Sequence, residues 1–352
     1  MKAVLIKNQK GPSSALYIGE ASKPARSSSD DVLIHVHCFG LNRMDILQRE
    51  GHYPVPPGAS PILGVEFSGT VAEIPDNNTS NSWSVGDKVF GLVTGGSYAE
   101  YVVCNQATLF KFPENLSNFD FVKAAAIPEV WLTATQVVLH IGKLQPNSRF
   151  LFHAGASGVG LAALQIARGS ANARTVYCTV GSNDKRDFLL SSVASSWASA
   201  SQTCPHSTEL VPINYREHDF ADAIKQHDPT PLDLIVDPVG QLYFQRNLDL
   251  LGRDSTLVLM GLMSGGVVTQ GPVDLSPILR KALRIEGTTL RARSIEYKTE
   301  LRRVFEARVL PHIFTGEFNV FIEKEFKWEN IIEAHNLMES NKTMGKIIVH
   351  VN

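Results

Sequence analysis

The chain has 352 residues, and a guideline of about 150 residues per domain favours two domains. Its 33 Lys and Arg against 35 Asp and Glu give a formal net charge of -2, without a basic block that would follow a phosphate backbone, so we do not expect nucleic acid as a partner. The cysteines Cys38, Cys104, Cys178 and Cys204 match neither a metal nor a disulfide spacing, which favours the cytoplasm. The sequence shows neither a signal peptide nor an apolar run of the roughly 18 to 20 residues that a membrane span needs, so we expect no membrane partner.

The predicted elements fall into two zones along the chain. From residue 1 to about 109, short apolar runs such as "KAVLIK", "DVLIHVHCFG", "GVEFSGTVAEI" and "DKVFGL" alternate with Gly, Pro and Asn, which predicts a mostly β domain. "AAAIPEVWLTATQVVLHIG" predicts a buried helix. The strands "RFLFHAG", "RTVYCTV", "DLIVDPVG", "TLVLMGLM" and "RIEGTTL" then alternate with helical stretches, which predicts a parallel sheet with helices on both faces and an α/β fold class.

The end of the chain and one internal segment complete the prediction. "EYKTELRRVFEARVL" and "WENIIEAHNLMES" predict two amphipathic helices, and "KIIVHV" predicts a last strand. Between Ser191 and Pro205, the segment "SSVASSWASASQTCP" is rich in Ser and Ala and lacks a clear period, so we expect a surface insertion.

The segment "RFLFHAGASGVGLAALQIAR" runs from a strand through a glycine-rich turn into a helix. This context is typical of a dinucleotide site, where small residues admit a pyrophosphate to the start of a helix. Gly155, Ser157 and Gly160 take the three glycine places of that motif. The alternative is a tight turn without a ligand. Short-chain dehydrogenases share "GASGVG" but need a Tyr-x-x-x-Lys pair, which none of the eight tyrosines forms.

The next strand indicates which dinucleotide binds. An acidic residue at its end would hold the ribose hydroxyls of NAD, but Val180 is followed by Gly181 and Ser182, with Lys185 nearby. This pattern suits the 2′-phosphate of NADPH, and Tyr215 could reach the same phosphate. A solvated loop of mixed charge, which includes Asp184, remains the alternative.

A later strand also ends in residues that suit a ligand site. Asp237 and Gly240 lie at the tip of this strand, where ligands of such folds bind. Asp237 could equally be a turn or helix-cap residue.

These segments together resemble the medium-chain dehydrogenase/reductase superfamily. Within it, "LNRMDILQREGHYPVPPGASPILGVEFSGTV", "AAAIPEVWLTATQ", "INYREHDF", "LMGLMSGG" and "NKTMGKI" are similar to the zinc-independent, zeta-crystallin-like quinone oxidoreductase branch, closest to its tumour-protein-inducible subgroup. The resemblance implies a GroES-like β domain at residues 1–125 and 290–352, a Rossmann domain at residues 126–289, and an active site in the cleft between them. The 191–205 insertion has no counterpart in this family.

The resemblance also implies chemistry without a metal. Zinc members of the superfamily carry Cys-x-x-Asp and Gly-His-Glu motifs, whose Cys and His bind the catalytic ion. This chain has Asn42-Arg43-Met44-Asp45 and Gly64-Val65-Glu66 in those places, and valine cannot coordinate a metal. We therefore expect no metal site.

The family pattern assigns further residues to the site. It implies catalytic roles for Asn42, Asp45 and Tyr53. It also implies that Asn42 and Thr133 lie near the nicotinamide and that Tyr53 faces the substrate. Capping and turn roles for Asn42 and Asp45, and a packing role for Tyr53, stay open. The cofactor contacts that the resemblance implies, besides those named above, are Gly158, Val159, Gly261, Leu262 and Met263.

The sequence therefore predicts an NADPH-dependent, metal-independent reductase of quinones or conjugated carbonyls. An enoyl reductase acting on activated C=C bonds is the nearer alternative, because the same hydride geometry serves both substrates. A non-catalytic protein that senses NADPH or binds RNA is the alternative from another class. Family members usually dimerise through the edges of their Rossmann sheets, so we expect a homodimer with "TLVLMGLM" at its interface.

Overall fold

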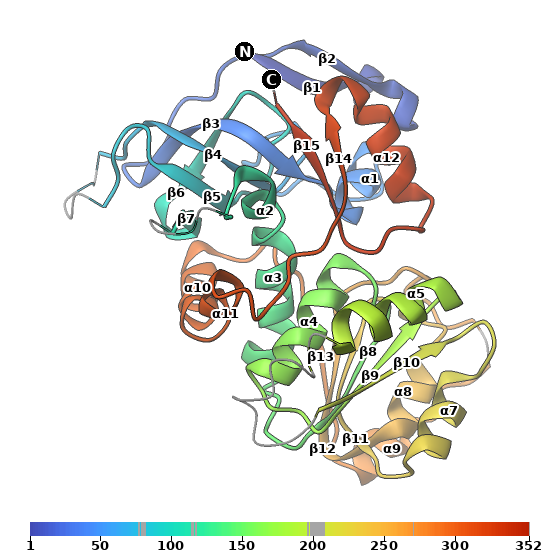
Figure 1. Ribbon diagram of the computed structural model, residues 1–352. Coiled ribbons are helices and arrows are strands. Elements are labelled where there is room, and N and C mark those ends of the chain that lie inside the picture. Colours follow the sequence, from blue (N-terminus) through green and yellow to red (C-terminus); the bar gives the residue numbers. More distant parts are fainter. Residues whose placement is uncertain are drawn as a thin grey trace. The chain divides into compact units, whose positions relative to one another are not determined.

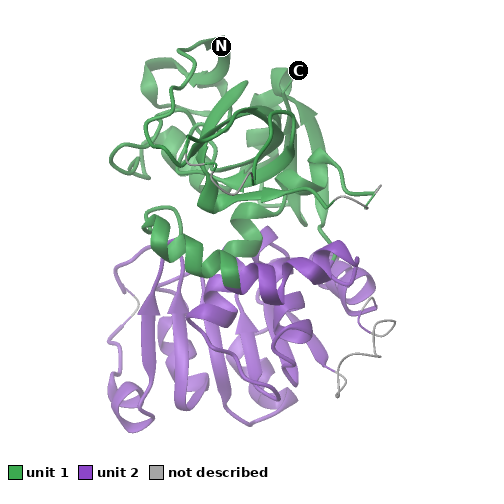
Figure 2. Cartoon of the chain, turned by 90° about the vertical axis from the view of Figure 1, so that its left-hand side faces the viewer, with its two compact units in different colours: residues 1–132, 290–303, 319–352 green, residues 133–289, 304–318 purple. Residues whose placement is uncertain are grey.

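The computed structural model describes residues 1–76, 78, 82–113, 116, 118–195, 197, 208–269 and 271–351 (Figure 1). The chain divides into two compact units, which Figure 2 shows in different colours. The first unit comprises residues 1–132, 290–303 and 319–352, and the second comprises residues 133–289 and 304–318. This division differs from the predicted boundaries in two places, because residues 126–132 belong to the first unit and residues 304–318 to the second.

Two contacts place the segment 304–318 in the second unit. The ring of Phe318 lies over Gly169, where a Cβ would come within 2.4 Å of a ring carbon. The Ser170 hydroxyl donates a hydrogen bond of 2.7 Å to the carbonyl of Arg308. Neither contact follows from the local sequence pattern, so the prediction kept this segment with the β domain.

The first unit is built around a seven-stranded sheet in the order β14-β15-β3-β4-β5-β7, in which β6 also pairs with β3. A two-stranded sheet joins β1 to β2. In β3, Val32, Ile34 and Val36 form one buried face, while the other face carries the buried Leu33 and the exposed His35. The strands are β1 (Lys2–Ile6), β2 (Leu16–Glu20), β3 (Asp31–Gly40), β4 (Glu66–Glu73), β5 (Lys88–Leu92), β6 (Tyr101–Asn105), β7 (Leu109–Lys111), β14 (Ile322–Lys327) and β15 (Lys346–His350).

The helices of this region are short, except for α10. They are α1 (Arg43–Glu50), α2 (Phe121–Ala125), α3 (Pro128–Thr135), α10 (Ile295–Arg308) and α12 (Ile331–Glu339), with 3-10 turns η1 (Lys7–Gln9), η2 (Ser13–Ala15), η3 (Gln106–Thr108) and η6 (Trp328–Asn330). The predicted buried helix at 124–142 is divided: α2 ends before Pro128, α3 begins there, and a π-helical stretch, η4 (Gln136–His140), follows. A proline is tolerated in the first turn of a helix but not in its interior, which explains the break.

The second unit contains a six-stranded parallel sheet in the order β10-β9-β8-β11-β12-β13. The first strand lies in the middle of this order, so the chain runs outward in one direction and then in the other, as the predicted doubly wound Rossmann fold requires. Figure 1 shows helices on both faces of the sheet. The elements are β8 (Arg149–Phe152), α4 (Gly158–Gly169), β9 (Thr175–Val180), α5 (Asn183–Phe188), η5 (Leu189–Ala194), β10 (Glu209–Asn214), α7 (Phe220–His227), β11 (Leu232–Asp237), α8 (Phe244–Leu250), β12 (Leu251–Leu259), α9 (Ser276–Arg280), β13 (Arg284–Gly287) and α11 (Leu310–Phe314).

Side chains from successive strands form one core of the second unit. Leu151, Tyr177, Ile235 and Leu257, one from each of four neighbouring strands, pack in one cluster with apolar residues of α7 and α8. Apolar side chains on the strands alternate between the two faces, and both faces are covered, so these strands read as continuous apolar runs. The fold class predicted from the strand and helix rhythm is confirmed.

Three details differ from the prediction or add to it. Strand β10 was not predicted, because Pro212 interrupts its apolar run; β10 is an edge strand, where a proline is tolerated. Strand β14, with the pattern "IEKEFK", was also not predicted, because four of its six residues are charged. Finally, β12 lies between β11 and β13, so the strand expected at a dimer interface is an interior strand and β13 is the edge.

The beginning of the Ser191 to Pro205 segment is not the exposed loop that its composition predicted. Residues 189–194 continue α5 as a π-helical stretch, and Val193 and Trp197 are buried. The Arg168 guanidinium donates to the carbonyl of Trp197 at 2.8 Å and lies over its ring. Residues 198–205 lie outside the described part of the chain. In the part that the structure describes, no helix is both long and apolar enough to cross a membrane.

Candidate active site

The glycine-rich turn joins β8 to α4 in the second unit. A Cβ on Gly155 would come within 2.6 Å of the Cβ of Cys178 in β9, and a Cβ on Gly160 would come within 2.6 Å of the carbonyl oxygen of Ala154. Ser157 is the N-cap of α4, and its hydroxyl oxygen accepts a hydrogen bond of 3.1 Å from the Gly160 N–H. Steric crowding therefore requires glycine at the first and third places of the motif, Gly155 and Gly160.

The start of α4 has the properties of an anion site. Ser157 is exposed, and Gly158 and Val159 are partly exposed, so the N–H groups of the first helical turn can be reached. The Ser157 hydroxyl accepts from Gly160 and still has its own hydrogen to donate. These residues fit a dinucleotide. Its pyrophosphate would accept hydrogen bonds from the N–H groups, and the helix dipole would stabilise its negative charge.

A buried polar chain lies beneath this turn, and the sequence did not predict it. Asn247 Nδ2 donates to the Asp237 carboxylate at 3.0 Å, so its Oδ1 is left to accept from His153 Nε2 at 2.9 Å. The other ring nitrogen, Nδ1, then accepts from the Thr179 hydroxyl at 3.2 Å, whose oxygen accepts from the Ala154 N–H at 3.2 Å. Burial lowers the pKa of His153 to about 4, which agrees with this neutral form.

The chain fixes the geometry at the head of the turn. Ala154 has φ 63, a left-handed conformation that costs a residue with a side chain about 1–2 kcal/mol. The hydrogen bond from the Ala154 N–H to Thr179 helps to hold it there. The only signal for His153 in the sequence is its place directly after β8, and Asn247 gives no signal at all.

The predicted cofactor-selecting residues gather at the end of β9. A Cβ on Gly181 would come within 2.8 Å of the Tyr215 hydroxyl, so the two residues are in contact, and the Tyr215 ring is 43% exposed. Ser182 is the N-cap of α5, and its hydroxyl oxygen accepts from the Lys185 N–H at 3.4 Å. Asp184 is exposed in the same first turn. The structure therefore brings Gly181, Ser182 and Tyr215 together at one strand end.

The loops after β11 and β12 meet at the same edge of the sheet. Asp237 is fully buried, and its carboxylate accepts from the N–H groups of Val239 and Gly240 at 2.6 and 3.1 Å. Burial raises its pKa to about 6. These contacts agree with the turn role that the sequence left open for Asp237.

The second of these two loops is the more exposed one. The N–H of Met263 donates to the Pro238 carbonyl at 3.0 Å, which joins the loop after β12 to the loop after β11. Gly261 also lies against Pro238, where a Cβ would come within 3.0 Å of its carbonyl oxygen. Leu262 and Met263 have exposed side chains.

In the first unit, Asn42 belongs to a buried three-residue cluster. Its Nδ2 donates to Glu66 Oε1 at 2.9 Å, and its Oδ1 accepts from Lys346 Nζ at 2.8 Å. Lys346 also forms an ion pair of 2.6 Å with Glu66 Oε1 and donates to the Leu41 carbonyl at 2.6 Å. Gly40 makes room, because a Cβ there would come within 2.4 Å of Glu66 Oε1. We call Asn42, Glu66 and Lys346 the amide cluster.

The fold explains how these three residues meet. Glu66 begins β4, Asn42 follows β3 and Lys346 begins β15, and β3 pairs with both other strands. The motifs "GVE" and "NKTMGKI" contain Glu66 and Lys346, but the sequence did not show that they would contact Asn42. Asn42 stands at the N-cap of α1, and its side chain also binds these two charged groups, so capping is not its only role.

Asp45 is buried beside the amide cluster and receives three donors. Its carboxylate accepts from the Asn42 N–H at 2.8 Å, the Gly64 N–H at 3.2 Å and the Tyr98 hydroxyl at 3.2 Å. Burial raises its pKa to about 6, although the hydrogen bonds from Asn42 and Tyr98 and the charges of Lys346 and Arg291 lower it. These contacts make Asp45 a support for the Asn42 backbone, which agrees with the capping role left open by the sequence.

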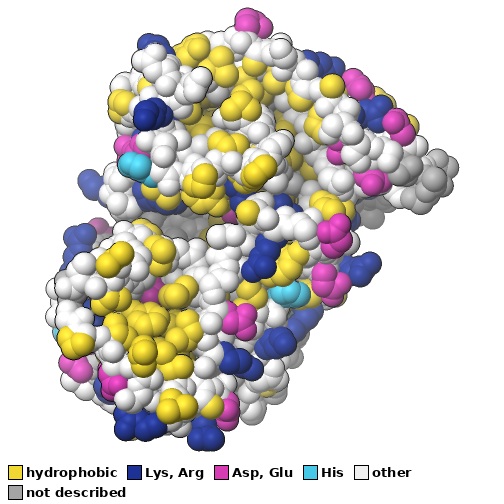
Figure 3. Space-filling view, turned by 180° about the vertical axis from the view of Figure 1, so that it is seen from behind, with side chains coloured by type: hydrophobic (Ala, Val, Ile, Leu, Met, Phe, Trp, Pro, Cys, Tyr) yellow, Lys and Arg dark blue, Asp and Glu magenta, His cyan; other side chains and the backbone are white. Residues whose placement is uncertain are grey.

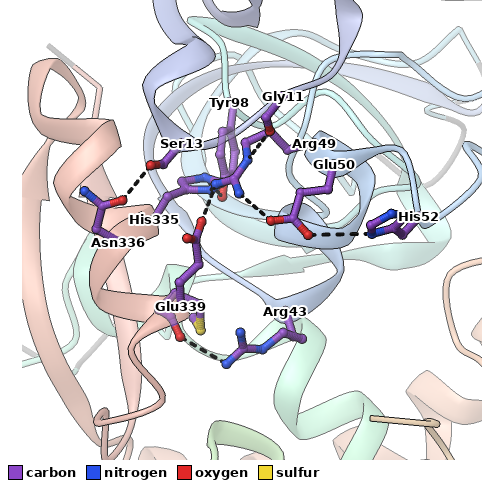
Figure 4. Close-up of polar contacts among 11 residues, drawn as sticks. Gly11, Ser13, Arg43, Arg49, Glu50, His52, Tyr98, His335, Asn336 and Glu339 are labelled. Atoms are coloured by element: carbon purple, nitrogen blue, oxygen red, sulfur yellow. Dashed lines mark hydrogen bonds and ion pairs between the residues drawn. The ribbon is translucent and has the colours of Figure 1, made fainter. Parts of the chain in front are cut away.

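Figure 4 shows the charged network around Arg49, which extends this support toward α12. The buried Arg49 guanidinium donates to Glu50, to the Gly11 carbonyl and to His335 Nδ1 at 3.0 Å, and it pairs with Glu339 at 2.6 Å. The other nitrogen of His335 lies 3.4 Å from the Tyr98 hydroxyl. Burial and the Arg49 charge lower the pKa of His335 to about 3, so the ring is neutral.

Tyr53 lies near charged groups that the sequence did not assign to the site. The Arg291 guanidinium carbon lies 5.5 Å from the centroid of the half-buried Tyr53 ring. The charges of Arg291 and Glu129 both act on the Tyr53 phenol, whose pKa burial raises. Thr133 lies on α3, four residues after Glu129; it is buried, and its hydroxyl has no hydrogen-bond partner among the described residues.

The two places that bind zinc in related enzymes hold residues of other kinds. The Asn42 side-chain amide is hydrogen-bonded to Glu66 and Lys346, and Val65 is fully buried in the core. Across the described ranges, no three His, Cys, Asp or Glu side chains gather as a metal site would require.

Two families match this chain: the alcohol dehydrogenase GroES-like domain at residues 28–114 and the zinc-binding dehydrogenase family at residues 208–349. The quinone oxidoreductase of Homo sapiens is 27% identical over 323 residues, covering 90% of this chain and 88% of that protein. The synaptic vesicle membrane protein VAT-1 homolog of Danio rerio is 31% identical over 338 residues, or 93% of this chain, and the chain spans 65% of that relative's length.

Two solved structures share the whole fold. The quinone oxidoreductase from Coxiella burnetii has a TM-score of 0.75 and 28% identity, covering 100% of this chain and 99% of that chain. The Escherichia coli quinone oxidoreductase, solved in complex with NADPH, has a TM-score of 0.80 and 24% identity, covering 100% of both chains. These likenesses confirm the predicted combination of a GroES-like domain and a parallel α/β sheet.

Proposed function

The chain belongs to the medium-chain dehydrogenase/reductase superfamily, in its quinone oxidoreductase branch, and from this premise we propose that it reduces quinones or conjugated carbonyls with NADPH and without a metal. Membership makes the chain an oxidoreductase, and the cofactor and the acceptor are the proposed part. Its place in the tumour-protein-inducible subgroup stays a prediction.

The observation that carries the proposal is the steric demand of the glycine-rich turn. A Cβ on Gly155 or on Gly160 would come within 2.6 Å of a neighbouring atom, so neither position can carry a side chain without a shift. Ser157 keeps a free hydroxyl hydrogen at the exposed start of α4. A turn built in this way suits a pyrophosphate. When bound, a reduced nicotinamide supplies a hydride, and the protein contributes the orientation of the reactants and the electrostatic field around them.

The amide cluster gives Asn42 a defined role in this proposal. An asparagine amide nitrogen carries two hydrogens, and one of them donates to Glu66. Lys346 holds the amide oxygen, so the amide cannot turn over without breaking both contacts. Asn42 can therefore present its second N–H to a ligand in one fixed orientation, while Tyr53 forms one wall of the substrate pocket.

The preference for NADPH is supported by the end of β9. Gly181 has no carboxylate to repel a 2′-phosphate, and Ser182, Tyr215 and the first turn of α5 provide hydroxyl and N–H donors there. Lys185 belongs to this turn and adds a positive charge, which the exposed Asp184 opposes. Charge-assisted hydrogen bonds of about 1.5–3 kcal/mol each make one surviving contact worth about ten- to a hundredfold in affinity.

One panel tests the function. The oxidation of NADPH is followed with ortho-quinones, with para-quinones, with enals and without an acceptor. We expect quinone-dependent turnover. Turnover with enals alone would favour the enoyl reductase, and binding of NADPH without turnover on any acceptor would favour a non-catalytic sensor.

A charge reversal tests the cofactor preference. Lys185→Glu should raise the KM for NADPH about ten- to a hundredfold and change that for NADH little, because NADH has no 2′-phosphate. Lys225→Glu, an exposed lysine on α7, is the control for a change of net charge. Equal kcat/KM for the two cofactors in the unmodified protein would refute the preference.

A second copy of this chain is the proposed partner. Strand β13 lies at the edge of the six-stranded sheet, where its outer backbone groups can pair with another strand. Figure 3 shows hydrophobic side chains gathered on a face of the second unit. The exposed apolar residues between β12 and β13 are Leu262, Met263, Val267, Val268, Leu275 and Leu279.

The oligomeric state can be tested at the most exposed of these residues. Leu279 is 85% exposed in the single chain, so Leu279→Glu should not disturb the folded unit, but it should shift a dimer toward monomer in sedimentation velocity. Leu190→Glu, an exposed leucine next to α5, is the control. A monomeric unmodified protein at micromolar concentration would refute the proposal.

The cysteines support a reducing compartment, such as the cytoplasm. Cys38, Cys104 and Cys178 are free and buried, and burial raises the pKa of the Cys38 and Cys104 thiols to about 12. Thiolates react and thiols do not, so these residues are stable as thiols.

A further inference from the structure

Glu129 is a buried acid that the proposed function does not yet use. It lies in the first turn of α3, its side chain is buried, and its Oε2 has no hydrogen-bond partner among the described residues. Its backbone N–H donates to Glu66 Oε2 at 2.8 Å, on the carboxylate whose other oxygen holds Asn42 and Lys346. The backbone of Glu129 is therefore anchored to the amide cluster, and one oxygen of its carboxyl group is left without a partner among the described residues.

Burial, more than the surrounding charges, keeps a proton on Glu129. Burial raises its pKa to about 8, and the negative charges of Glu66 and Asp45 act in the same direction. The positive charges of Lys346 and Lys298 act against it but do not reverse the shift. The charges that face Glu129 from the other elements are those of Arg291 and, when it ionises, the Tyr53 phenol. At neutral pH the group is therefore a carboxylic acid with a hydrogen to donate.

Arg291 is a second buried polar group of the first unit, and its guanidinium can only donate hydrogen bonds. Arg291 is 2% exposed as a residue, its Nε donates to the Thr94 carbonyl at 2.7 Å, and both Nη1 and Nη2 are without a partner among the described residues. Its charge acts on both Glu129 and Tyr53, and it lies over the Tyr53 ring. A buried donor without an acceptor costs about 1–3 kcal/mol, and more when it is charged, so this arrangement calls for an oxygen from a ligand.

We propose that Arg291 and Glu129 form the site for the carbonyl oxygen of the substrate, with Arg291 binding that oxygen and Glu129 protonating it. The proposal rests on the proposed function and extends it, because it assigns the proton that a reduced quinone or enone must gain. It also states the substrate class: an acceptor whose conjugated carbonyl oxygen can reach both groups.

The proton step balances in atoms and electrons. The hydride brings two electrons to the conjugated system of the acceptor, and negative charge develops on the carbonyl oxygen, where the Arg291 guanidinium stabilises it. The O–H bond of Glu129 breaks, the proton bonds to the substrate oxygen, and the electron pair of that O–H bond stays on the carboxylate. A proton taken up from solution then restores the Glu129 carboxylic acid, so one NADPH and one proton are consumed per acceptor reduced.

The first test does not depend on turnover. Duroquinone, which has no free ring position for addition of a thiol, is bound to the protein in the presence of NADP⁺, and its carbonyl stretching band is recorded by infrared difference spectroscopy. We expect a shift to lower frequency in the unmodified protein and a return to the free position in Arg291→Met. At pH 7 a protonated carboxyl band should be present in the unmodified protein and lost in Glu129→Gln.

The second test is kinetic. Glu129→Gln keeps the size of the side chain but cannot release a proton, so kcat should fall about a hundredfold, within the range for a general acid, while the KM for NADPH changes less than twofold. The fall of kcat above about pH 8, expected as Glu129 loses its proton, should disappear in this variant. Glu129→Asp keeps an acid and should recover part of the activity. Glu333→Gln, an exposed glutamate of α12, is the control for loss of a carboxylate.

The outcomes separate this site from the proposed function. A carbonyl band that is the same in the unmodified protein and in Arg291→Met, or a Glu129→Gln variant with unchanged kcat and pH profile, would overturn the site while leaving the reductase intact. Absence of turnover with every acceptor in the unmodified protein would refute the proposed function instead. If Glu129→Gln does not fold, the carboxyl band of the unmodified protein and the kinetics of Glu129→Asp decide.

Discussion

Replacing Lys346 by methionine should destabilise the first unit, because it leaves the Glu66 carboxylate buried without its counter-ion. Lys346 Nζ lies 2.6 Å from Glu66 Oε1 and also donates to the Leu41 carbonyl and to Asn42 Oδ1. Glu66 is fully buried and Lys346 nearly so, which keeps water from replacing the ammonium group. Methionine has a similar length, so the change removes mainly charge and hydrogen bonds rather than volume.

The expected loss is about 3–5 kcal/mol, the usual cost of removing one partner of a buried ion pair. At about 2–4 °C per kcal/mol for a domain of roughly 150–250 residues, this corresponds to a fall in Tm of about 6–20 °C. The Asn42 amide loses its second anchor at the same time. We therefore expect kcat to fall in the variant even at temperatures where it stays folded.

The assay is equilibrium unfolding in urea at pH 7, followed by both fluorescence and circular dichroism because the two units can unfold in separate steps. The double variant Lys346→Met/Glu66→Gln should recover much of the loss, because it leaves no buried charge uncompensated. Lys342→Met, an exposed lysine close by in the sequence, should change stability by no more than about 0.5 kcal/mol. A loss below 1 kcal/mol in Lys346→Met, or strict additivity in the double variant, would refute the reasoning.

Five further experiments have definite expected outcomes. Gly155→Ala should weaken NADPH binding in fluorescence titration and lower stability by about 1–3 kcal/mol, because the new methyl group would meet Cys178 at 2.6 Å. Trp197→Ala should cost about 3–5 kcal/mol in urea unfolding, since the ring is buried, whereas replacing residues 198–205 by a short Gly/Ser link should leave kcat within a few-fold. Chelators should leave quinone reduction unchanged, and metal analysis should find zinc well below one ion per chain; activity lost to chelation and restored by zinc would contradict this. Because the pKa of Glu129 is raised from 4.5 to about 8 in the folded chain, its contribution to stability is present below pH 4.5 and is lost as the pH rises through about 8, so Glu129→Gln should flatten the pH dependence of unfolding over that window.

The local sequence was sufficient for five of the six strands of the second unit's sheet. Its strands are apolar runs and its turns are marked by glycines. The spacing of the apolar residues and the positions of the glycines together predicted the parallel sheet, and they placed Gly155, Ser157 and Gly160 at the start of α4. The same reasoning missed β10 and β14, where a proline and a series of charges hide the strand pattern. Composition also misjudged Trp197, because a polar segment can still bury one large side chain.

The sequence by itself determined which residue types stand at the zinc places and at the end of β9, and so it predicted a reductase that uses NADPH without a metal. Only the tertiary structure showed what those residues contact. Asn42, Glu66, Glu129 and Lys346 are separated by up to hundreds of positions, yet pairing of β3 with β4 and β15 brings three of them into hydrogen-bond distance, and α3 adds the fourth. The protonation of Glu129 depends on burial and on its distance from other charges, and these are properties of the packed fold that neither residue type nor spacing along the chain contains.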